Sequence, residues 1–308
     1  MNTVARLRSD GILYTNLFDE FSSPSRNVGV DQSGIFYSNT MKEGEFAGLP
    51  ANTPMRIMSD KSLLVGNYFD ELTGIDNVTA AVVMSAMLVL DLDASLYSGS
   101  GNWLDNSGYS NNASLVATPT YISGGGSYFN LDGLVTTGFG SNDSFLVNDA
   151  VTMDSMSDIS FEMWINIDNV LGFGSPNMLF DKRLSTSNGY VGFFTDSGFT
   201  FRMGTSSASQ FSYSTTPTTL SWLHLIVTVG SSGSRLYINN TEVASSVYTG
   251  NFSNINTSAG LVIGDLSISA TGVHSFDGKI GLFRIYNGIL TPSDVNNRWV
   301  ATKHRFGL

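Results

Sequence analysis

One stretch, residues 220–245, constrains the fold of this chain more than any other. It reads LSWLHLIVTVGSSGSRLYINNTEVAS. Apolar residues at 222–229 predict a strand, residues 230–234 supply a Gly/Ser turn, and residues 236–238 begin the returning strand. The pair Asn239-Asn240 then turns the chain again. The stretch therefore predicts a β-hairpin followed by a second tight turn.

Strand signals recur at short intervals through residues 87–308. Residues 159–167 alternate, which predicts Phe161, Met163, Ile165 and Ile167 on one face and Ser160, Glu162, Trp164 and Asn166 on the other. Further strands are predicted at 87–93, 127–134, 177–182, 190–195, 199–203, 210–214, 260–264 and 278–286. Short strands at this spacing are typical of a β-sandwich. A short helix is predicted within 290–304, where Thr291 caps it and Pro292 fits its first turn.

Composition agrees with many strands joined by polar turns, because Gly is abundant (32 of 308 residues) and only 13% of residues are charged. The net charge of −11 argues against binding of a nucleic-acid backbone. The sequence has no cysteine, which excludes a disulfide framework and a thiolate nucleophile or metal ligand.

The first residues, MNTVARLRSDGILY, lack the apolar core of a signal peptide. The longest apolar run, 80–90, falls short of the roughly 20 residues that a membrane helix needs. We therefore expect synthesis in a cytoplasm, no membrane insertion and no cleaved secretion signal.

Residues 1–74 differ from the rest of the chain. They carry six of the 15 Lys and Arg residues, and short strand-like pieces occur at 4–7, 11–16, 34–38, 55–58 and 63–65. None is long enough to bury a core alone. We interpret the segment as an attachment arm or small β-subdomain, and the alternative is a set of extra strands on the main domain. Residues 75–86 form a connector that is either a short helix or a strand, and 87–308 form the main domain.

An ordered set of motifs carries a family resemblance over residues 87–304. The motifs are LVLDLDA at 88–94, W-x-D-x-S-G at 103–108, YFNLDG at 128–133, ISFEMWINI at 159–167, W-x-H-x-x-V-x-V at 222–229 with LYIN at 236–239, IG at 263–264, F-x-G-K-I-G-L-F-R-I-Y-N at 276–287 and ILTPSDV at 289–295. The set resembles the laminin G-like, concanavalin A-like lectin/glucanase superfamily, especially versions in virion structural proteins of tailed phages. The resemblance implies an all-β jelly-roll sandwich of two antiparallel sheets. V-A-R-L-x-S-D-G-x-L at 4–13, with F-D-E at 18–20, resembles the start of such virion proteins and implies anchoring to a particle.

Few residues in the sequence support an enzymatic function. Glycoside hydrolysis needs two carboxylates, and glucanases that the chain resembles place them at alternate positions of one strand. The comparable strand here offers only Glu162, whereas Asp91 and Asp93 alternate on another strand. His224 lies within a predicted strand and is better interpreted as a sheet position than as a catalytic base. We expect a protein that is not an enzyme.

Ligand sites are expected at the loops and sheet rims. Calcium is the most plausible ion, because oxygen-rich loops suit a hard cation; the candidate ligands are Asp105, Asn106, Asp132, Asp265 and Asp277. Turn chemistry explains the same residues without a metal. Related modules often carry an Asp after the G-x-I of the late strand, but here Gly281 follows Ile280. Four aromatic residues are candidates for glycan binding, Trp103, Tyr109, Trp164 and Tyr213.

The leading functional hypothesis is a non-enzymatic virion structural protein, a capsid decoration or head-fibre component. Residues 1–74 would contact other virion proteins of the capsid or tail, and the lectin-like sandwich would face outward. A homo-oligomer is expected, since symmetric assemblies are the rule. The alternative is a receptor- or glycan-binding module of a tail fibre that binds host surface glycans, and the third possibility is a glycoside-degrading depolymerase.

Overall fold

The chain divides into two units, Met1–Met84 and Ser85–Leu308. The computed structural model describes residues 87–124, 126–133, 142–170, 174–204, 210–267 and 275–308, and six short strands before them. The division falls inside the predicted connector, residues 75–86.

Three small hairpins are described in the first unit. They are β1 (Ala5–Leu7) with β2 (Leu13–Thr15), β3 (Val28–Val30) with β4 (Phe36–Ser38), and β5 (Met55–Ile57) with β6 (Leu63–Val65). Five of these strands coincide with predicted pieces. β3 was not predicted, because its Gly29 interrupts the β-branched pattern that signals a strand. An attachment role for this unit stays a prediction.

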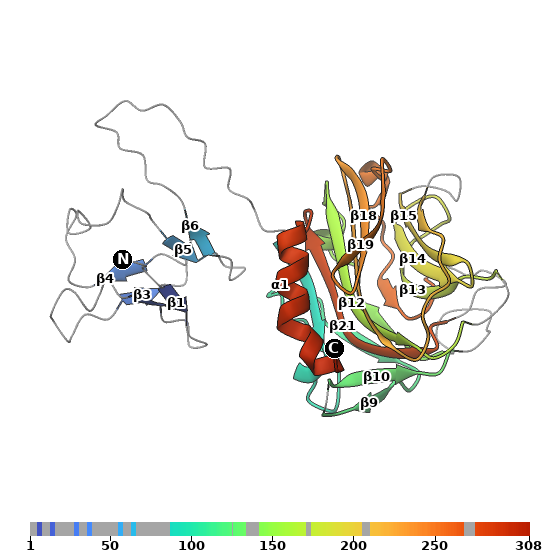
Figure 1. Ribbon diagram of the computed structural model, residues 1–308, viewed down its shortest axis with the longest axis horizontal. Coiled ribbons are helices and arrows are strands. Elements are labelled where there is room, and N and C mark those ends of the chain that lie inside the picture. Colours follow the sequence, from blue (N-terminus) through green and yellow to red (C-terminus); the bar gives the residue numbers. More distant parts are fainter. Residues whose placement is uncertain are drawn as a thin grey trace. The chain divides into compact units, whose positions relative to one another are not determined.

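Two antiparallel sheets form the second unit, which confirms the predicted all-β jelly-roll sandwich (Figure 1). One sheet, named here the β12 sheet, has the order β19-β18-β17-β12-β21-β10-β9, and β7 also pairs with β21. Its strands are β7 (Met87–Asp93), β9 (Thr120–Ile122), β10 (Tyr128–Leu131), β12 (Ile159–Ile167), β17 (Trp222–Gly230), β18 (Gly233–Ile238), β19 (Thr241–Ser246) and β21 (Gly278–Asn287).

The other sheet, named here the β14 sheet, has the order β16-β15-β14-β13-β20-β11-β8. Its strands are β8 (Ala113–Val116), β11 (Ser144–Val147), β13 (Asn177–Lys182), β14 (Tyr190–Thr195), β15 (Gly198–Met203), β16 (Phe211–Tyr213) and β20 (Leu261–Ile263). The short strands β8, β9 and β11 were not predicted, because strands of three or four residues carry little periodicity.

The predicted hairpin of residues 220–245 is confirmed as β17 and β18, followed by β19. Asn239 and Asn240 both have positive φ, 50° and 66°, as a type I′ turn between antiparallel strands requires. The side chain of Asn239 also accepts a hydrogen bond from the backbone N of His224 (2.8 Å). The two asparagines therefore fix the register of three strands in the β12 sheet.

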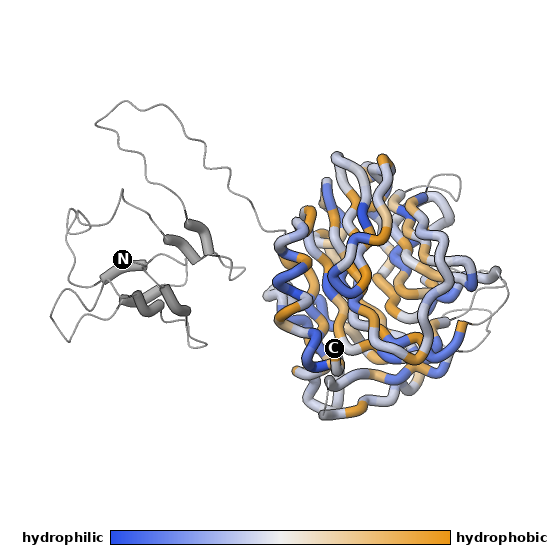
Figure 2. Tube along the Cα trace, in the orientation of Figure 1, coloured by the Kyte–Doolittle hydropathy of each residue, from blue (hydrophilic) through white to orange (hydrophobic). Residues whose placement is uncertain are grey.

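The core lies between the two sheets, where the apolar residues that alternate along the strands of each sheet meet (Figure 2). On β12 the predicted inward residues, Phe161 among them, do face this core. The ring of Phe161 stacks on Phe180 from the β14 sheet, with centroids 4.4 Å apart. Such offset aromatic pairs add about 1 kcal/mol beyond the area that they bury.

β12 is buried along its whole length, although one face of an antiparallel sheet is often wet. The cause is α1 (Pro292–Thr302), which continues into a 3-10 turn, η4 (Lys303–Phe306), and lies against the outer face of the β12 sheet (Figure 1). Thr291 and Asp294 form a capping box at its start, which confirms the predicted helix. No helix in the described part of the chain has the length and apolar character that a membrane crossing requires.

Candidate functional site

Glu162 is the centre of a buried polar network between the β12 sheet and α1. Its carboxylate accepts a hydrogen bond from the hydroxyl of Tyr286 (2.5 Å) and lies 3.0 Å from Nε2 of His224. The guanidiniums of Arg284 and Arg298 approach the same carboxylate to 3.6 and 3.8 Å. Strand pairing places His224, Arg284 and Tyr286 on the same face as Glu162, because residues that alternate in the same phase meet across a sheet. Arg298 reaches the carboxylate from α1.

The charges of this network compensate one another. Burial alone would raise the pKa of Glu162, but the charge of Arg284 and the hydrogen bond with His224 lower that pKa well below its usual range. Burial and the neighbouring Glu162 raise the pKa of the Tyr286 hydroxyl well above its ordinary value. Glu162 is thus held as an anion by its partners, in a place that solvent does not reach.

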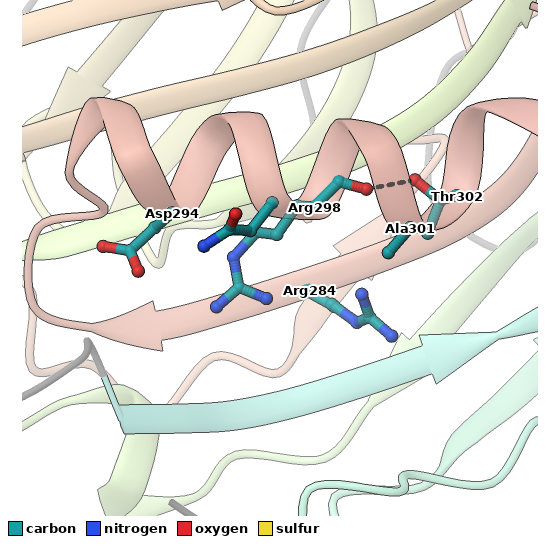
Figure 3. A pocket seen from close by; sticks show the side chains of 6 residues that line it. Arg284, Asp294, Arg298, Ala301 and Thr302 are labelled. Carbon is teal, nitrogen blue, oxygen red and sulfur yellow. Dashed lines mark hydrogen bonds between the residues drawn. The ribbon is translucent and has the colours of Figure 1, made fainter. Parts of the chain in front are cut away.

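A hollow of about 270 Å³ lies between α1 and β21 beside this network (Figure 3). It is lined by Arg284, Asp294, Asn297, Arg298, Ala301 and Thr302. Both arginines are already engaged. Arg284 donates to Asp91 (2.6 Å), and Arg298 lies over the ring of Tyr286 (4.2 Å). The hollow therefore lies beside arginines that already face groups of the protein, and Asp294 at its edge accepts from the backbone N and the hydroxyl of Thr291.

The carboxylates that hydrolysis would require are also engaged. Asp91 and Asp93 do lie on the outer face of β7, but each pairs with an arginine, Arg284 and Arg305 respectively. Glu162 lies beneath α1 with no exposed surface. A polysaccharide has no path to this carboxylate while the helix is in place.

Two of the predicted glycan-binding aromatics need correction, because Trp103 and Trp164 are fully buried. Trp103 packs in the core with Phe129 and Phe145, both at centroid distances of 4.9 Å. Trp164 stacks on Phe306 (4.3 Å) beneath the C-terminal segment. Neither ring has a face open to a sugar. In the sequence Trp103 begins a run of mostly polar residues, WLDNSGYSNN, and such a run does not show that the tryptophan folds inward.

The other two predicted aromatics are accessible but lie apart. Tyr109 is 39% exposed on the loop before β8, and its hydroxyl donates to Sδ of Met87 (3.2 Å). Tyr213 is half-buried on β16, the edge strand of the other sheet, opposite Phe199. The four predicted residues thus do not form one site, and a role for Tyr109 or Tyr213 stays a prediction.

Two predicted metal ligands serve as turn residues. The carboxylate of Asp105 accepts hydrogen bonds from the backbone N of Asp91, Ser107 and Asn111, at 2.8–2.9 Å. The side chain of Asn106 donates to the backbone oxygen of Asp91 (3.3 Å). These contacts are the turn chemistry that the sequence also allowed.

The other three predicted ligands gather at one rim of the sandwich without converging on a point. Asp143 accepts a bond from the backbone N of Asp132 (3.4 Å), and Asn142 donates to Asp265 (3.4 Å). Asp277 accepts from the side chain of Asn169 (2.7 Å). Within the described ranges, no three His, Cys, Asp or Glu side chains are close enough to hold a metal ion. Calcium binding stays a prediction.

Asp265→Asn is expected to change how stability depends on pH. Burial raises the pKa of Asp265 to about 6, although the backbone N of Leu266 donates to it. The native state therefore holds this proton more tightly than the unfolded chain, whose Asp pKa is about 3.9, and stability falls as pH rises from about 4 to 6. Asn cannot ionise, so the variant lacks this loss. The free energy of unfolding of the variant should therefore rise relative to that of the parent by about 2–3 kcal/mol on going from pH 4 to pH 8.

Urea unfolding in EDTA at both pH values measures this difference. EDTA is needed because a bound cation would favour the carboxylate and lower the pKa. Asp196→Asn, in an exposed turn between β14 and β15, is the matched control. Identical pH profiles for the parent and the Asp265 variant would contradict the raised pKa.

An arginine on the outer face of the β14 sheet was missed by sequence reasoning. Arg202 of β15 lies opposite Val191 of β14, with its guanidinium 4.9 Å from the ring centroid of Phe193. Its Nε donates to the side chain of Gln210 (2.9 Å). The available signal was its alternation with Phe201 and Met203, which places it outside the core.

The comparisons agree with this architecture. Residues 139–296, about half of the chain, match the family model of the concanavalin A-like lectin/glucanases superfamily. The chain therefore belongs to this superfamily. No curated protein matches the sequence.

Several solved structures share the fold. One is of botulinum neurotoxin type C, which depends on interaction with two ganglioside molecules to enter cells (TM-score 0.55, 16% identity, 70% of this chain and 51% of that chain). Another is the binding domain of Paraclostridial Mosquitocidal Protein 1 (TM-score 0.55, 18% identity, 70% and 52%). The chain thus spans about half the length of these toxin structures.

A third similar structure has nearly the same extent as the sandwich. It is domain 4 of AbnA, an extracellular arabinanase from Geobacillus stearothermophilus, in complex with arabinotriose (TM-score 0.51, 19% identity). The match covers 69% of this chain and 98% of that domain. At these identities the similarity shows a lectin-like fold that binding domains use.

Proposed function

We propose that Ser85–Leu308 is a non-catalytic, saccharide-binding sandwich. The observation that carries this proposal is the closed outer face of the β12 sheet. Its acidic residue Glu162 is neutralised and lies beneath α1, so the face that would hold a hydrolase centre performs a structural task. The open surfaces are the loops, the rims and the outer face around Arg202.

The similar structures support a binding role. The arabinanase domain was solved with arabinotriose, and its length matches the sandwich of this chain. The neurotoxin depends on gangliosides, which carry sugar headgroups. For the present chain, saccharide binding is an inference from the fold combined with surface polar groups next to aromatic rings.

A glycan array probed with the full chain tests this function. We expect binding to a restricted set of saccharides, with no cleavage of bound oligosaccharides on prolonged incubation. An array without any bound saccharide would contradict the proposal. Release of shortened oligosaccharides would instead favour a depolymerase.

A position on a phage particle is a second proposal, which rests on different observations. The resemblance of residues 4–13 and 18–20 to virion structural proteins supports it. So does the division of the chain into two compact units, Met1–Met84 and Ser85–Leu308. In this arrangement the first unit contacts other virion proteins, and the sandwich is displayed as a capsid decoration, head fibre or tail-fibre module.

Purified particles provide the test. Mass spectrometry should detect the chain at a copy number that fits capsid or tail symmetry, and crosslinks should join residues of the first unit to another virion protein. Analytical ultracentrifugation of the isolated chain should show a symmetric homo-oligomer. Absence of the chain from purified particles would contradict the virion assignment.

A further inference from the structure

The outer face of the β14 sheet has an open, polar part next to a covered, apolar part. On β15 the side chains of Thr200 and Arg202 point outward, because the residues between them face the core. Ser212 of β16 pairs with Thr200, and their hydroxyl oxygens lie 3.2 Å apart. Gln210 and Ser212 are exposed, and Thr200 and Arg202 are partly so.

Arg202 is held in place by neutral groups. The ring of Phe193 lies beneath the guanidinium, at 4.9 Å from Cζ, and the side-chain oxygen of Gln210 accepts from Nε (2.9 Å). Within the described residues, the two Nη groups have no hydrogen-bond acceptor. A guanidinium in this setting presents a planar pair of donors in a fixed orientation.

Among the described residues, no carboxylate pairs with Arg202, which distinguishes it from every other arginine in residues 87–308. The other five each have an acidic group within 4 Å in the described part of the chain; the pairs are Arg183–Asp181, Arg235–Glu242, Arg284–Asp91, Arg298–Glu162 and Arg305–Asp93. Residues 125, 134–141, 171–173, 205–209 and 268–274 contain no Asp or Glu in their sequences. The C-terminal unit therefore holds no hidden acidic partner in these segments.

The surroundings make this cation receptive to an external anion. Partial burial lowers the pKa of Arg202, and the nearby positive charge of Arg183 lowers it further. The negative charge of a carboxylate bound at the Nη groups would oppose both effects, because it favours the protonated guanidinium. Arginine pairs with carboxylates through two parallel hydrogen bonds, which are stronger than bonds between neutral groups.

We propose that Arg202, Gln210, Thr200 and Ser212 form a subsite for the carboxylate of an acidic saccharide, such as a uronic acid. The Nη groups would hold the carboxylate, and the two hydroxyls and the amide would bond to sugar hydroxyls. The ring of Phe193 is itself buried and supports the guanidinium from below. This inference rests on the proposed saccharide-binding function and adds the charge class of the ligand.

A saccharide fits this surface better than an acidic peptide does. Around the single uncompensated cation lie hydroxyl and amide groups, which match a ligand that carries one carboxylate among several hydroxyls. An acidic peptide offers carboxylates without neighbouring hydroxyls, so it would leave the hydroxyls of Thr200 and Ser212 without a ligand group. The net charge of −11 opposes long polyanions from a distance, but such repulsion is screened beyond about 8 Å at physiological salt.

Isothermal titration of the full chain with an oligogalacturonate, in 150 mM salt (about physiological), tests the subsite. The matched ligand is the methyl ester of the same oligomer, which keeps every hydroxyl and removes the negative charges. We expect the ester to bind about 10- to 100-fold more weakly, as expected for loss of a charge-assisted bidentate contact. Equal affinities for the acid and the ester would overturn the proposal without the need for any variant.

Protein variants locate the site. Arg202→Gln should weaken oligogalacturonate binding by about 10- to 100-fold, and Arg202→Lys, which keeps the charge but loses the planar fork, should give an intermediate loss. Arg235→Gln is the matched control, because Arg235 is an exposed arginine of the β12 sheet. Unchanged binding in Arg202→Gln would overturn the assignment. Circular dichroism checks that each variant is folded.

The remaining outcomes separate this inference from the broader function. Binding of neutral glycans but not of the oligogalacturonate would overturn the acidic subsite and leave saccharide binding in place. Failure of every glycan to bind would overturn both. Equal affinity for an oligoglutamate would replace the saccharide by an acidic peptide as the ligand.

Discussion

Glu162→Gln is expected to lower the free energy of unfolding by about 3–5 kcal/mol, as measured by urea denaturation at pH 7. The substitution removes the negative charge that Arg284 and Arg298 share. Arg284 keeps Asp91 as a partner, whereas the half-buried Arg298 is left with no carboxylate within 4 Å among the described residues. Removing one member of a buried ion pair costs about this much, because an uncompensated charge remains. Glutamine keeps the shape of the side chain, so the loss reports on charge.

The pH dependence of this loss follows from the lowered pKa of Glu162. The native state binds this proton less tightly than the unfolded chain does. The stabilisation is therefore complete above the unfolded pKa of about 4.3 and disappears as pH falls below it. The variant and the parent should converge in acid. Glu242→Gln, in the exposed pair with Arg235, is the control and should change stability little. A Glu162 variant as stable as the parent at pH 7 would contradict this account of the network.

Lys182→Met is expected to lower the free energy of unfolding by a similar amount, about 3–5 kcal/mol. The Lys182 side chain has no solvent exposure, and its Nζ donates to Asp154 (2.6 Å), Asp149 (2.8 Å) and the backbone oxygen of Thr257 (3.1 Å). Methionine has a similar length but no donor. The carboxylate of Asp154, which is itself buried, then loses its counter-charge.

A double variant separates charge from packing at this site. Lys182→Met with Asp154→Asn removes both charges, and it should recover part of the stability that Lys182→Met loses. Asp149 is left more exposed to water than Asp154, so its charge needs no replacement. If the double variant is no more stable than the single one, packing around the lysine stem accounts for the loss.

The sequence predicted the elements whose signals are local. β12 and β17 carry long alternating or β-branched patterns between clear turn residues, and the helix carries Thr291 and Asp294 at its start. Such signals depend only on neighbours in the chain. The position of α1 against the β12 sheet depends on contacts such as Trp164 with Phe306, which are distant in sequence.

The candidate site was harder to predict for the same reason. Glu162 and His224 were recognised as sheet residues, but their contact follows from the pairing of β12 with β17, which periodicity does not reveal. Trp164 looked accessible because its strand alternates, and only a helix from far along the chain buries it. Arg202 stands out only because no described carboxylate lies near it in the fold. A linear sequence does not show which residues become neighbours in space.

The pairing of β21 has a consequence for how the protein is made. β21 pairs with β12 and also with β7 and β10, so the β12 sheet is held together by residues 278–287. Arg284 lies opposite Asp91, almost 200 residues earlier in the chain. In a nascent chain that lacks residues 278–287, β7, β10 and β12 have no β21 to pair with. We expect assembly of the sandwich to wait until most of the chain has left the ribosome, and shortened translation products to depend on chaperones or be degraded.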